Sequence, residues 1–202
     1  MENKKYELLD NDTVTTWDGR TLKRIRALVA IGSLVAAGEL GGYIESEDNL
    51  SQVSGNAWVS GNAQVYGNAR VYGNAQVSGN AWVSGNARVS GNAWVSGDAR
   101  VYGNAQVSGN AQVYGNAWVS GDARVEQRRD IFWMSIIGSE NGTYTAFKNK
   151  DGGVSVNRGC FNGTLEQFVD AVNERHTGQF HQEYQLVIEL TKIRLGVIEE
   201  AV

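Results

Sequence analysis

The chain has 202 residues, enough for one moderate domain with small additions, and its 18 basic and 22 acidic side chains give a net charge of −4. No segment is charged strongly enough to predict duplex nucleic acid as a partner. No apolar run has the length of a membrane span or the form of a signal peptide, and the one cysteine cannot form an internal disulfide, so we expect a soluble cytoplasmic protein.

Residues 1–33 predict an N-terminal β cap. The run TVTTWDGRTLKRI, residues 13–25, contains two β-rich stretches on either side of an Asp-Gly pair. Because this dipeptide is typical of two-residue turns, the run predicts a β-hairpin.

The next segment, LVAAGELGGYIESEDNLSQ over residues 34–52, predicts an irregular first coil. In this interpretation Leu40 and Ile44 face inward, and Gly41 and Gly42 form a corner that uses the conformational freedom of glycine.

A strict six-residue period fills the middle of the chain. Valine falls at every sixth position from Val53 to Val125, which gives 12 consecutive hexapeptides of the form V-[SY]-G-[ND]-A-x. An α-helix repeats its faces every 3.6 residues, so this period indicates a short strand followed by a corner. Alternation along the strand sends Ala and Val to one side and the variable residues to the other, while Gly-Asn provides the turn.

The repeat closely resembles the left-handed β-helix family, in which three hexapeptides complete one triangular coil. The resemblance implies a mainly β chain, with a left-handed parallel β-helix of about four regular triangular coils within residues 34–126. At the spacing of β-strands this stack is about 20 Å tall. Its two ends need covers because they leave ladder groups unpaired.

Three hexapeptides per coil also predict which outward side chains stack. The first face carries Trp58, Gln76, Trp94 and Gln112; the second carries Gln64, Trp82, Arg100 and Trp118, with Tyr66 and Tyr102; the third carries Arg70, Arg88, Gln106 and Arg124, with Tyr72. The aromatic and arginine residues in these three sets are the predicted binding surface, because such residues dominate protein interfaces and exposed apolar patches mark contacts. The alternative is that the outward aromatics only stabilise neighbouring rungs.

Residues 127–202 predict a C-terminal α+β cap and oligomerisation domain. Three runs, IFWMSII, TYTAF and GVSV, are separated by turn residues and predict a three-stranded meander. Thr164 and Gln167 predict a capping box that opens a first helix. Gly178 ends that helix, and a second runs from about Phe180 to Leu195.

The second predicted helix has two apolar stripes. One contains Tyr184, Val187, Ile188 and Leu195; the other contains Leu186, Leu190, Ile193 and Val197. A helix that is apolar on both sides is usually buried on both sides. One stripe can pack on the meander, and we predict the second as an oligomer contact in a homodimer or homotrimer.

Enzymatic chemistry has weak support in the sequence. Many left-handed β-helix proteins are acyltransferases with a histidine base on or beside the coils, but this repeat has no histidine and no interrupting loop. Cys160, His176 and His181 lack the ligand spacing of a structural zinc site, and we expect Cys160 to be a small buried residue after a strand. We therefore expect no catalytic residue, no cofactor and no metal, and acyl transfer is the most distant alternative.

Four segments, DGRTLKRIRAL, GELGGYIESE, the G-N-A repeats and GCFNGTLEQF, together resemble a group of phage and prophage proteins of unassigned function. The resemblance implies a bacteriophage origin and action inside a bacterial cell. The leading hypothesis is a non-enzymatic protein whose aromatic and basic surface binds a host protein or a small anionic signal, for example to inhibit a bacterial defence system. The competing hypothesis is a structural scaffold like the polymer-forming bactofilins, although the extra material at both ends should block endless stacking.

Overall fold

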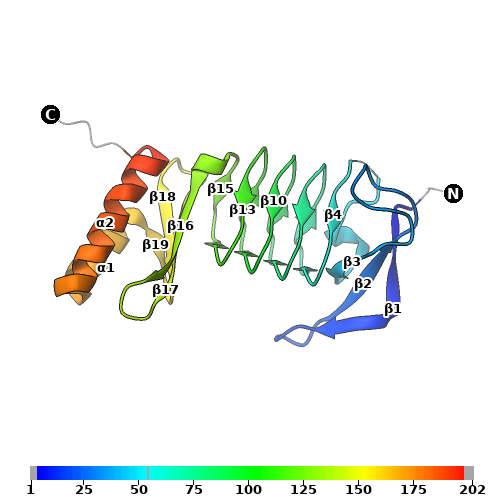
Figure 1. The fold of residues 1–202 in the computed structure, drawn as a ribbon, viewed down its shortest axis with the longest axis horizontal. Helices are drawn as coiled ribbons and strands as arrows, with labels where there is room; N and C mark the ends of the chain where they lie inside the picture. The colour runs from blue at the N-terminus through cyan, green and yellow to red at the C-terminus, as the bar shows by residue number, and fades with distance from the viewer. Residues whose placement is uncertain (1–3, 54, 198–202) are drawn as a thin grey trace.

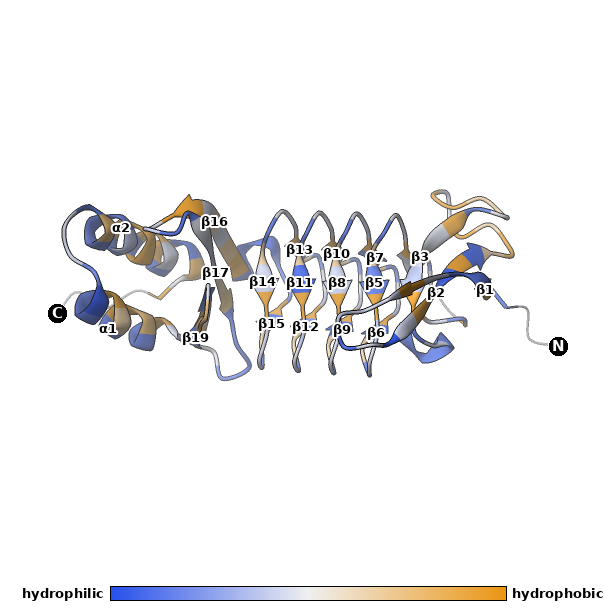
Figure 2. Cartoon of the chain, turned by 90° about the horizontal axis from the view of Figure 1, so that it is seen from below, coloured by the Kyte–Doolittle hydropathy of each residue, from blue (hydrophilic) through white to orange (hydrophobic). Residues whose placement is uncertain are grey.

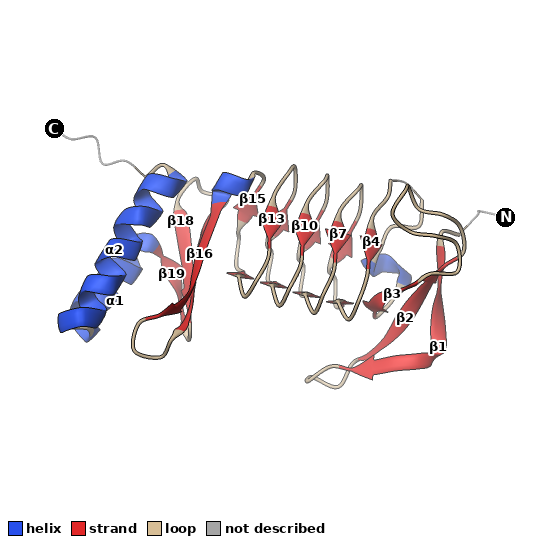
Figure 3. Cartoon of the chain, viewed as in Figure 1, coloured by secondary structure: helices blue, strands red, loops and turns tan. Residues whose placement is uncertain are grey.

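The computed structural model describes residues 4–53 and 55–197. In these residues, 19 strands, two short 3-10 turns and two α-helices follow one another along an elongated molecule. The N-terminal strands lie at one end, a stack of coils forms the middle, and a sheet with both α-helices lies at the other end (Figures 1 and 3). The fold is a mainly β solenoid with a cap at each end, as the sequence predicts.

The N-terminal cap is a hairpin that continues one wall of the solenoid. β1 (Tyr6–Thr15) and β2 (Thr21–Ala27) pair antiparallel, which confirms the predicted hairpin. β2 also pairs antiparallel with β3 (Leu40–Ile44), and β3 pairs in parallel with β5 (Gln64–Val65) of the stack. The hairpin and the coils therefore share one sheet.

The first coil differs from the prediction in two ways. Ile44 is fully buried, but Leu40 is 50% exposed. Gly41 and Gly42 lie within β3 and not at a corner. A Cβ on Gly41 would lie 2.6 Å from the carbonyl oxygen of Val59, so glycine is needed there for close backbone approach.

Twelve two-residue strands build the regular coils. They are β4 (Trp58–Val59), β5 (Gln64–Val65), β6 (Arg70–Val71), β7 (Gln76–Val77), β8 (Trp82–Val83), β9 (Arg88–Val89), β10 (Trp94–Val95), β11 (Arg100–Val101), β12 (Gln106–Val107), β13 (Gln112–Val113), β14 (Trp118–Val119) and β15 (Arg124–Val125). Among these twelve strands each residue pairs in parallel with the one 18 positions later, so three hexapeptides complete one turn. With β3 as an additional rung, the described chain makes about five turns.

The interior of the coils is filled as predicted. From β4 to β15, every valine and the alanine two positions before it are at most 2% exposed. Along each rung the hydropathy rises from the variable residue to the apolar valine, as the colours of the rungs show (Figure 2). Val53, which opens the repeat in the sequence, is 79% exposed because it precedes the first regular rung.

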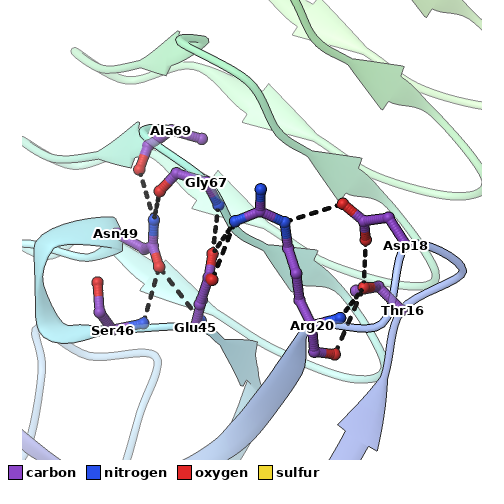
Figure 4. Close-up of polar contacts among 8 residues, drawn as sticks. All are labelled: Thr16, Asp18, Arg20, Glu45, Ser46, Asn49, Gly67 and Ala69. Carbon is purple, nitrogen blue, oxygen red and sulfur yellow. Dashed lines mark hydrogen bonds and ion pairs between the residues drawn. The ribbon is translucent and has the colours of Figure 1, made fainter.

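A polar network closes the first coil and attaches the hairpin to it (Figure 4). The fully buried Asn49, in the 3-10 turn η1 (Glu47–Asn49), donates to the carbonyl oxygens of Gly67 and Ala69, at 2.9 Å each. Glu45 accepts a hydrogen bond from the Gly67 amide at 2.7 Å and from the Arg20 guanidinium at 3.0 Å. These contacts satisfy ladder groups that the coil end would otherwise leave unpaired.

The C-terminal cap has four strands, one more than predicted. β16 (Ile131–Ile137), β17 (Gly142–Lys148), β18 (Val154–Arg158) and β19 (Phe161–Thr164) form an antiparallel meander after the 3-10 turn η2 (Arg128–Asp130). β19 was missed because its sequence, FNGT, has no apolar alternation. The sheet covers the last coil. The backbone amide of Trp118 donates to the Thr145 hydroxyl at 3.1 Å, and the side-chain amide of Asn157 donates to the Trp118 carbonyl at 2.9 Å.

Two helices cover the outer face of this sheet. α1 (Leu165–Arg175) begins with the predicted capping box, in which Thr164 and Gln167 exchange hydrogen bonds of 2.9 and 3.3 Å. α1 ends at Arg175, before the predicted end at Gly178, and Gly178 is instead the first residue of α2 (Gly178–Leu195). The stripe of α2 that contains Tyr184, Val187, Ile188 and Leu195 is buried, in a core separate from that of the coils.

Candidate binding surface

The second face of the solenoid carries a ladder of stacked aromatic and basic side chains. The register places Gln64, Trp82, Arg100 and Trp118 on successive rungs, as predicted. The guanidinium carbon of Arg100 lies 5.0 Å from the ring centroid of Trp82 and 4.7 Å from that of Trp118. We refer to Trp82, Arg100 and Trp118 as the ladder.

The ladder holds a cation between two rings and leaves it accessible. Arg100 is exposed, both tryptophans are half-buried, and none of the ion pairs among the described residues includes Arg100. Each cation–π contact at such a site contributes about 0.5–1 kcal/mol. Because Arg100 is exposed and has no ion-pair partner among the described residues, its N–H groups remain available to a carboxylate or phosphate.

A groove of about 390 Å³ adjoins the ladder where the last coils meet the C-terminal sheet. Asp98, Arg100 and Trp118 line it from the solenoid. From the cap it is lined by Glu140, Thr143 and Arg158. The ladder is thus the exposed edge of a recess between two parts of the molecule.

Trp58 and Tyr66, predicted as binding-surface residues, are buried: their exposed fractions are 1% and 7%. Both occupy outward positions of their coils, but the N-terminal segment lies over them. The ring of Tyr6 meets that of Trp58 edge-on at 6.3 Å, and Leu22 of the hairpin packs against Tyr66. These two residues belong to the core and cannot meet a partner.

On the first face, Trp94 remains a surface residue and is 52% exposed. Tyr114, which is not part of the predicted binding surface, is 51% exposed and packs edge-on against Trp133 of β16, with ring centroids 4.4 Å apart. Tyr114 follows Val113 at an outward position of the hexapeptide pattern, and this position alone predicts that its side chain is exposed. Tyr102 on the second face is half-buried, and Tyr72 is 41% exposed.

The third face is basic. Arg70 and Arg88 are exposed and pair in register on adjacent rungs, which brings two like charges close together. Arg124 is also exposed and has a loose ion pair with Glu126, with an N–O distance of 3.9 Å. Adjacent like charges destabilise a sheet slightly, and none of the cation–π contacts of the described residues includes an arginine of this face, which distinguishes it from the ladder.

The exposed stripe of α2 agrees only in part with the predicted oligomer contact. Leu186, Leu190 and Ile193 are 73%, 37% and 71% exposed. Val197 instead packs partly against the C-terminal core. Gly196 takes a left-handed conformation with φ 73°, which ends the helix and redirects the chain before Val197.

Cys160, His176 and His181 do not form one site. Cys160 is exposed in the turn between β18 and β19, so the prediction that it is buried is wrong: it follows the strand in a surface turn. His176 lines a pocket with Cys160, whereas His181 lies 3.0 Å from the side-chain oxygen of Asn173. Within the described residues no three His, Cys, Asp or Glu side chains gather as a metal site would require.

Neither α-helix in residues 4–53 and 55–197 is long and apolar enough to cross a membrane.

The three in-register parallel sheets define a β-solenoid repeat protein. Its repeats match the family model of the YdcK beta-solenoid repeat in overlapping segments, at residues 51–65, 63–79, 75–91, 81–97, 93–109, 105–121 and 111–127. The match covers the coils and leaves both caps outside it. No curated protein matches the chain.

Proposed function

We propose that this chain is a non-enzymatic binding scaffold whose ladder contacts a host protein or a small anionic signal. The observation that carries the proposal is Arg100, held between Trp82 and Trp118 with its N–H groups open to solvent beside a groove. A phage origin, action in the bacterial cytoplasm and inhibition of a defence system are further parts of the proposal, and they rest on the family resemblance.

Rigidity supports a binding role. Backbone hydrogen bonds join each rung of the ladder to the next, for example from the Trp82 amide to the Ala99 carbonyl and from the Arg100 amide to the Ala117 carbonyl, both at 2.9 Å. The stacked side chains lose little conformational freedom when a partner binds, so more of the contact energy appears as affinity.

The chemistry of the ladder indicates the chemistry of the partner. A guanidinium edge favours a carboxylate or phosphate, and the indole rings on either side favour an aromatic or aliphatic group. We therefore propose a target that places a negative group between apolar ones.

We also propose that the protein forms a homodimer or homotrimer through Leu186, Leu190 and Ile193 of α2. Three large aliphatic side chains on one exposed helix face are a patch that usually marks a contact.

The structural-scaffold alternative is less well supported. The N-terminal hairpin and the C-terminal sheet cover the two ends of the coil stack. Growth of a filament from coil end to coil end would have to displace these caps. Filaments of the purified protein under electron microscopy would favour the scaffold role over the binding role.

The test replaces Trp82, Arg100 and Trp118 by alanine and compares affinity capture from a bacterial host lysate, followed by mass spectrometry. The matched control replaces Arg88, Gln106 and Arg124 on the third face. We expect the ladder variant to lose a partner that the wild type and the control retain, with unchanged β-sheet circular dichroism. Equal capture by all three proteins would refute the proposal.

A further inference from the structure

A pocket of about 220 Å³ lies within the C-terminal cap, between the sheet and the two helices. Phe168, Val172, Tyr184 and Arg158 form its buried part, while Glu140, Cys160 and Arg175 are exposed at its mouth. This volume is below that of sites for drug-sized molecules, so the pocket fits a small ligand.

Arg158 brings an uncompensated charge to this pocket. The residue is 9% exposed, and its Nη2 donates to the Ile137 carbonyl at 2.8 Å. Its buried Nε has no hydrogen-bond partner, and none of the ion pairs of the described residues includes it. A guanidinium has five N–H donors, and burying its charge without a partner is costly.

The remaining walls are aromatic. The rings of Phe161 and Phe168 lie 5.1 Å apart, and those of Phe168 and Tyr184 lie 5.6 Å apart. His176 packs on Tyr184 at 4.9 Å. Burial raises the pKa of Tyr184, so its phenol stays a neutral group and adds no competing negative charge.

We propose that this pocket binds a small organic carboxylate with an aromatic or branched apolar body, the carboxylate facing Arg158 and the body lying among Phe161, Phe168 and Tyr184. None of the three ladder residues lines this pocket, although Arg158 and Glu140 also line the groove beside the ladder, and the proposal goes beyond the binding function proposed for the ladder. Arg175 adds a second positive charge at the mouth, and together the two arginines outweigh Glu140 and the negative end of α1. A purely structural role for Arg158 would need only the bond to Ile137 and the contact with Tyr184, whose ring centroid lies 5.8 Å from the guanidinium carbon, and neither provides a partner for the buried Nε.

Phenylacetate is a suitable probe, with benzyl alcohol and acetate as comparisons that lack the charge or the ring. We expect calorimetry on the full chain to give a dissociation constant of about 1 mM or tighter for phenylacetate, and at least tenfold weaker binding for each comparison compound. Equal binding of benzyl alcohol would overturn the role of Arg158, and absence of phenylacetate binding would overturn the site.

The alkylation rate of Cys160 tests where the ligand binds, and this test needs no amino-acid substitution. It is the only cysteine and lies at the mouth, so phenylacetate should slow its alkylation by iodoacetamide in proportion to occupancy. Binding with an unchanged alkylation rate would place the ligand elsewhere and contradict the proposal.

Two variants complete the test. Arg158→Gln should weaken phenylacetate binding at least tenfold, and Ala171→Leu should fill the pocket and block binding even if the first variant folds poorly. Arg100→Ala on the ladder should bind phenylacetate as the wild type does. This variant distinguishes a failure of the pocket proposal from a failure of the proposal that the ladder binds a partner. Full binding by Ala171→Leu would contradict the assigned pocket.

Discussion

Trp58 and Trp94 occupy equivalent outward positions two rungs apart in one sheet, yet only one of them is covered. Trp58 is 1% exposed and its indole N–H has no hydrogen-bond partner, so its contribution to stability comes from packing under the N-terminal cap. Trp94 is 52% exposed.

We predict that Trp58→Ala lowers the free energy of unfolding by about 3–5 kcal/mol, the usual cost of removing a buried tryptophan. Trp94→Ala, its matched control, should change that free energy by about 0.5 kcal/mol or less. Urea denaturation of both variants checks this, and similar losses in both would show that the cap does not cover Trp58.

Asp130 is a second residue whose burial has a measurable consequence. It accepts hydrogen bonds from the amides of Glu126 and Gln127 at 3.0 and 2.8 Å, and it pairs with Lys148 at 3.0 Å. Burial acts to raise its pKa, but Lys148 and the two amides outweigh burial and leave the pKa of Asp130 lowered.

A carboxyl group with a lowered folded-state pKa stabilises the protein above its ordinary pKa of about 3.9, and this contribution disappears as the pH falls toward the lowered value. We predict that Asp130→Asn lowers the free energy of unfolding at pH 7 by about 1–3 kcal/mol. Because the wild type loses its advantage in acid, the difference between the two proteins should shrink between pH 5 and pH 2 in denaturation experiments. A constant difference would contradict the ion pair.

At the scale of the elements, the corner glycines are what allow the coils to stack. Gly91 and Gly121 both have positive φ, of 65° and 60°. A Cβ on Gly91 would lie 2.8 Å from the Gly109 amide nitrogen of the next coil, whereas a Cβ on Gly121 would have nothing within 4 Å.

Gly121→Ala should therefore cost only the left-handed backbone strain, about 1–2 kcal/mol in the free energy of unfolding. Gly91→Ala should cost a further 1 kcal/mol or more, since a neighbouring backbone must move by a few tenths of an ångström (roughly the range for overpacking). Thermal and urea unfolding of the two variants measure the difference. Equal costs would mean that close stacking of the corners does not constrain them.

The exposed stripe of α2 is the element that bears on assembly. We expect Leu186→Glu with Ile193→Glu to convert a dimer or trimer into a monomer, because two charges would be buried in the contact. Light scattering at micromolar concentration measures the mass, and Leu34→Glu, at another exposed leucine, is the control. A wild-type protein that is already a monomer at this concentration would show that the exposed stripe of α2 is not a contact between subunits.

At the scale of the whole molecule, the regular coils were predictable because each one depends on local chemistry. A valine at every sixth position and a glycine at each corner determine which residues face inward, and the pairing of Trp82 with Arg100 follows from the 18-residue register. Burial of Trp58 and Tyr66 was not predictable in the same way. It depends on contacts with the N-terminal hairpin, from Tyr6, 52 positions before Trp58, and from Leu22, 44 positions before Tyr66, and nothing in the hexapeptides encodes these contacts.

The pocket around Arg158 could not be predicted from the sequence either. Its walls come from β18, β19, α1, α2 and the turn between β16 and β17, and Arg158 is the last residue of β18, where no sequence motif marks it. Only the packing of the helices on the sheet brings the guanidinium to 5.8 Å from the ring centroid of Tyr184 and places Phe168 in the lining of the same pocket.

The most direct test of the account measures the dissociation constant of the captured partner for the wild type, the ladder variant and the third-face control. If the ladder is the contact, loss of its three side chains should weaken binding at least 30-fold, the effect of removing about 2 kcal/mol of interface energy. The control with Arg88, Gln106 and Arg124 replaced should bind within about threefold of the wild type by the same relation. A ladder variant that binds as tightly as the wild type would contradict the central claim.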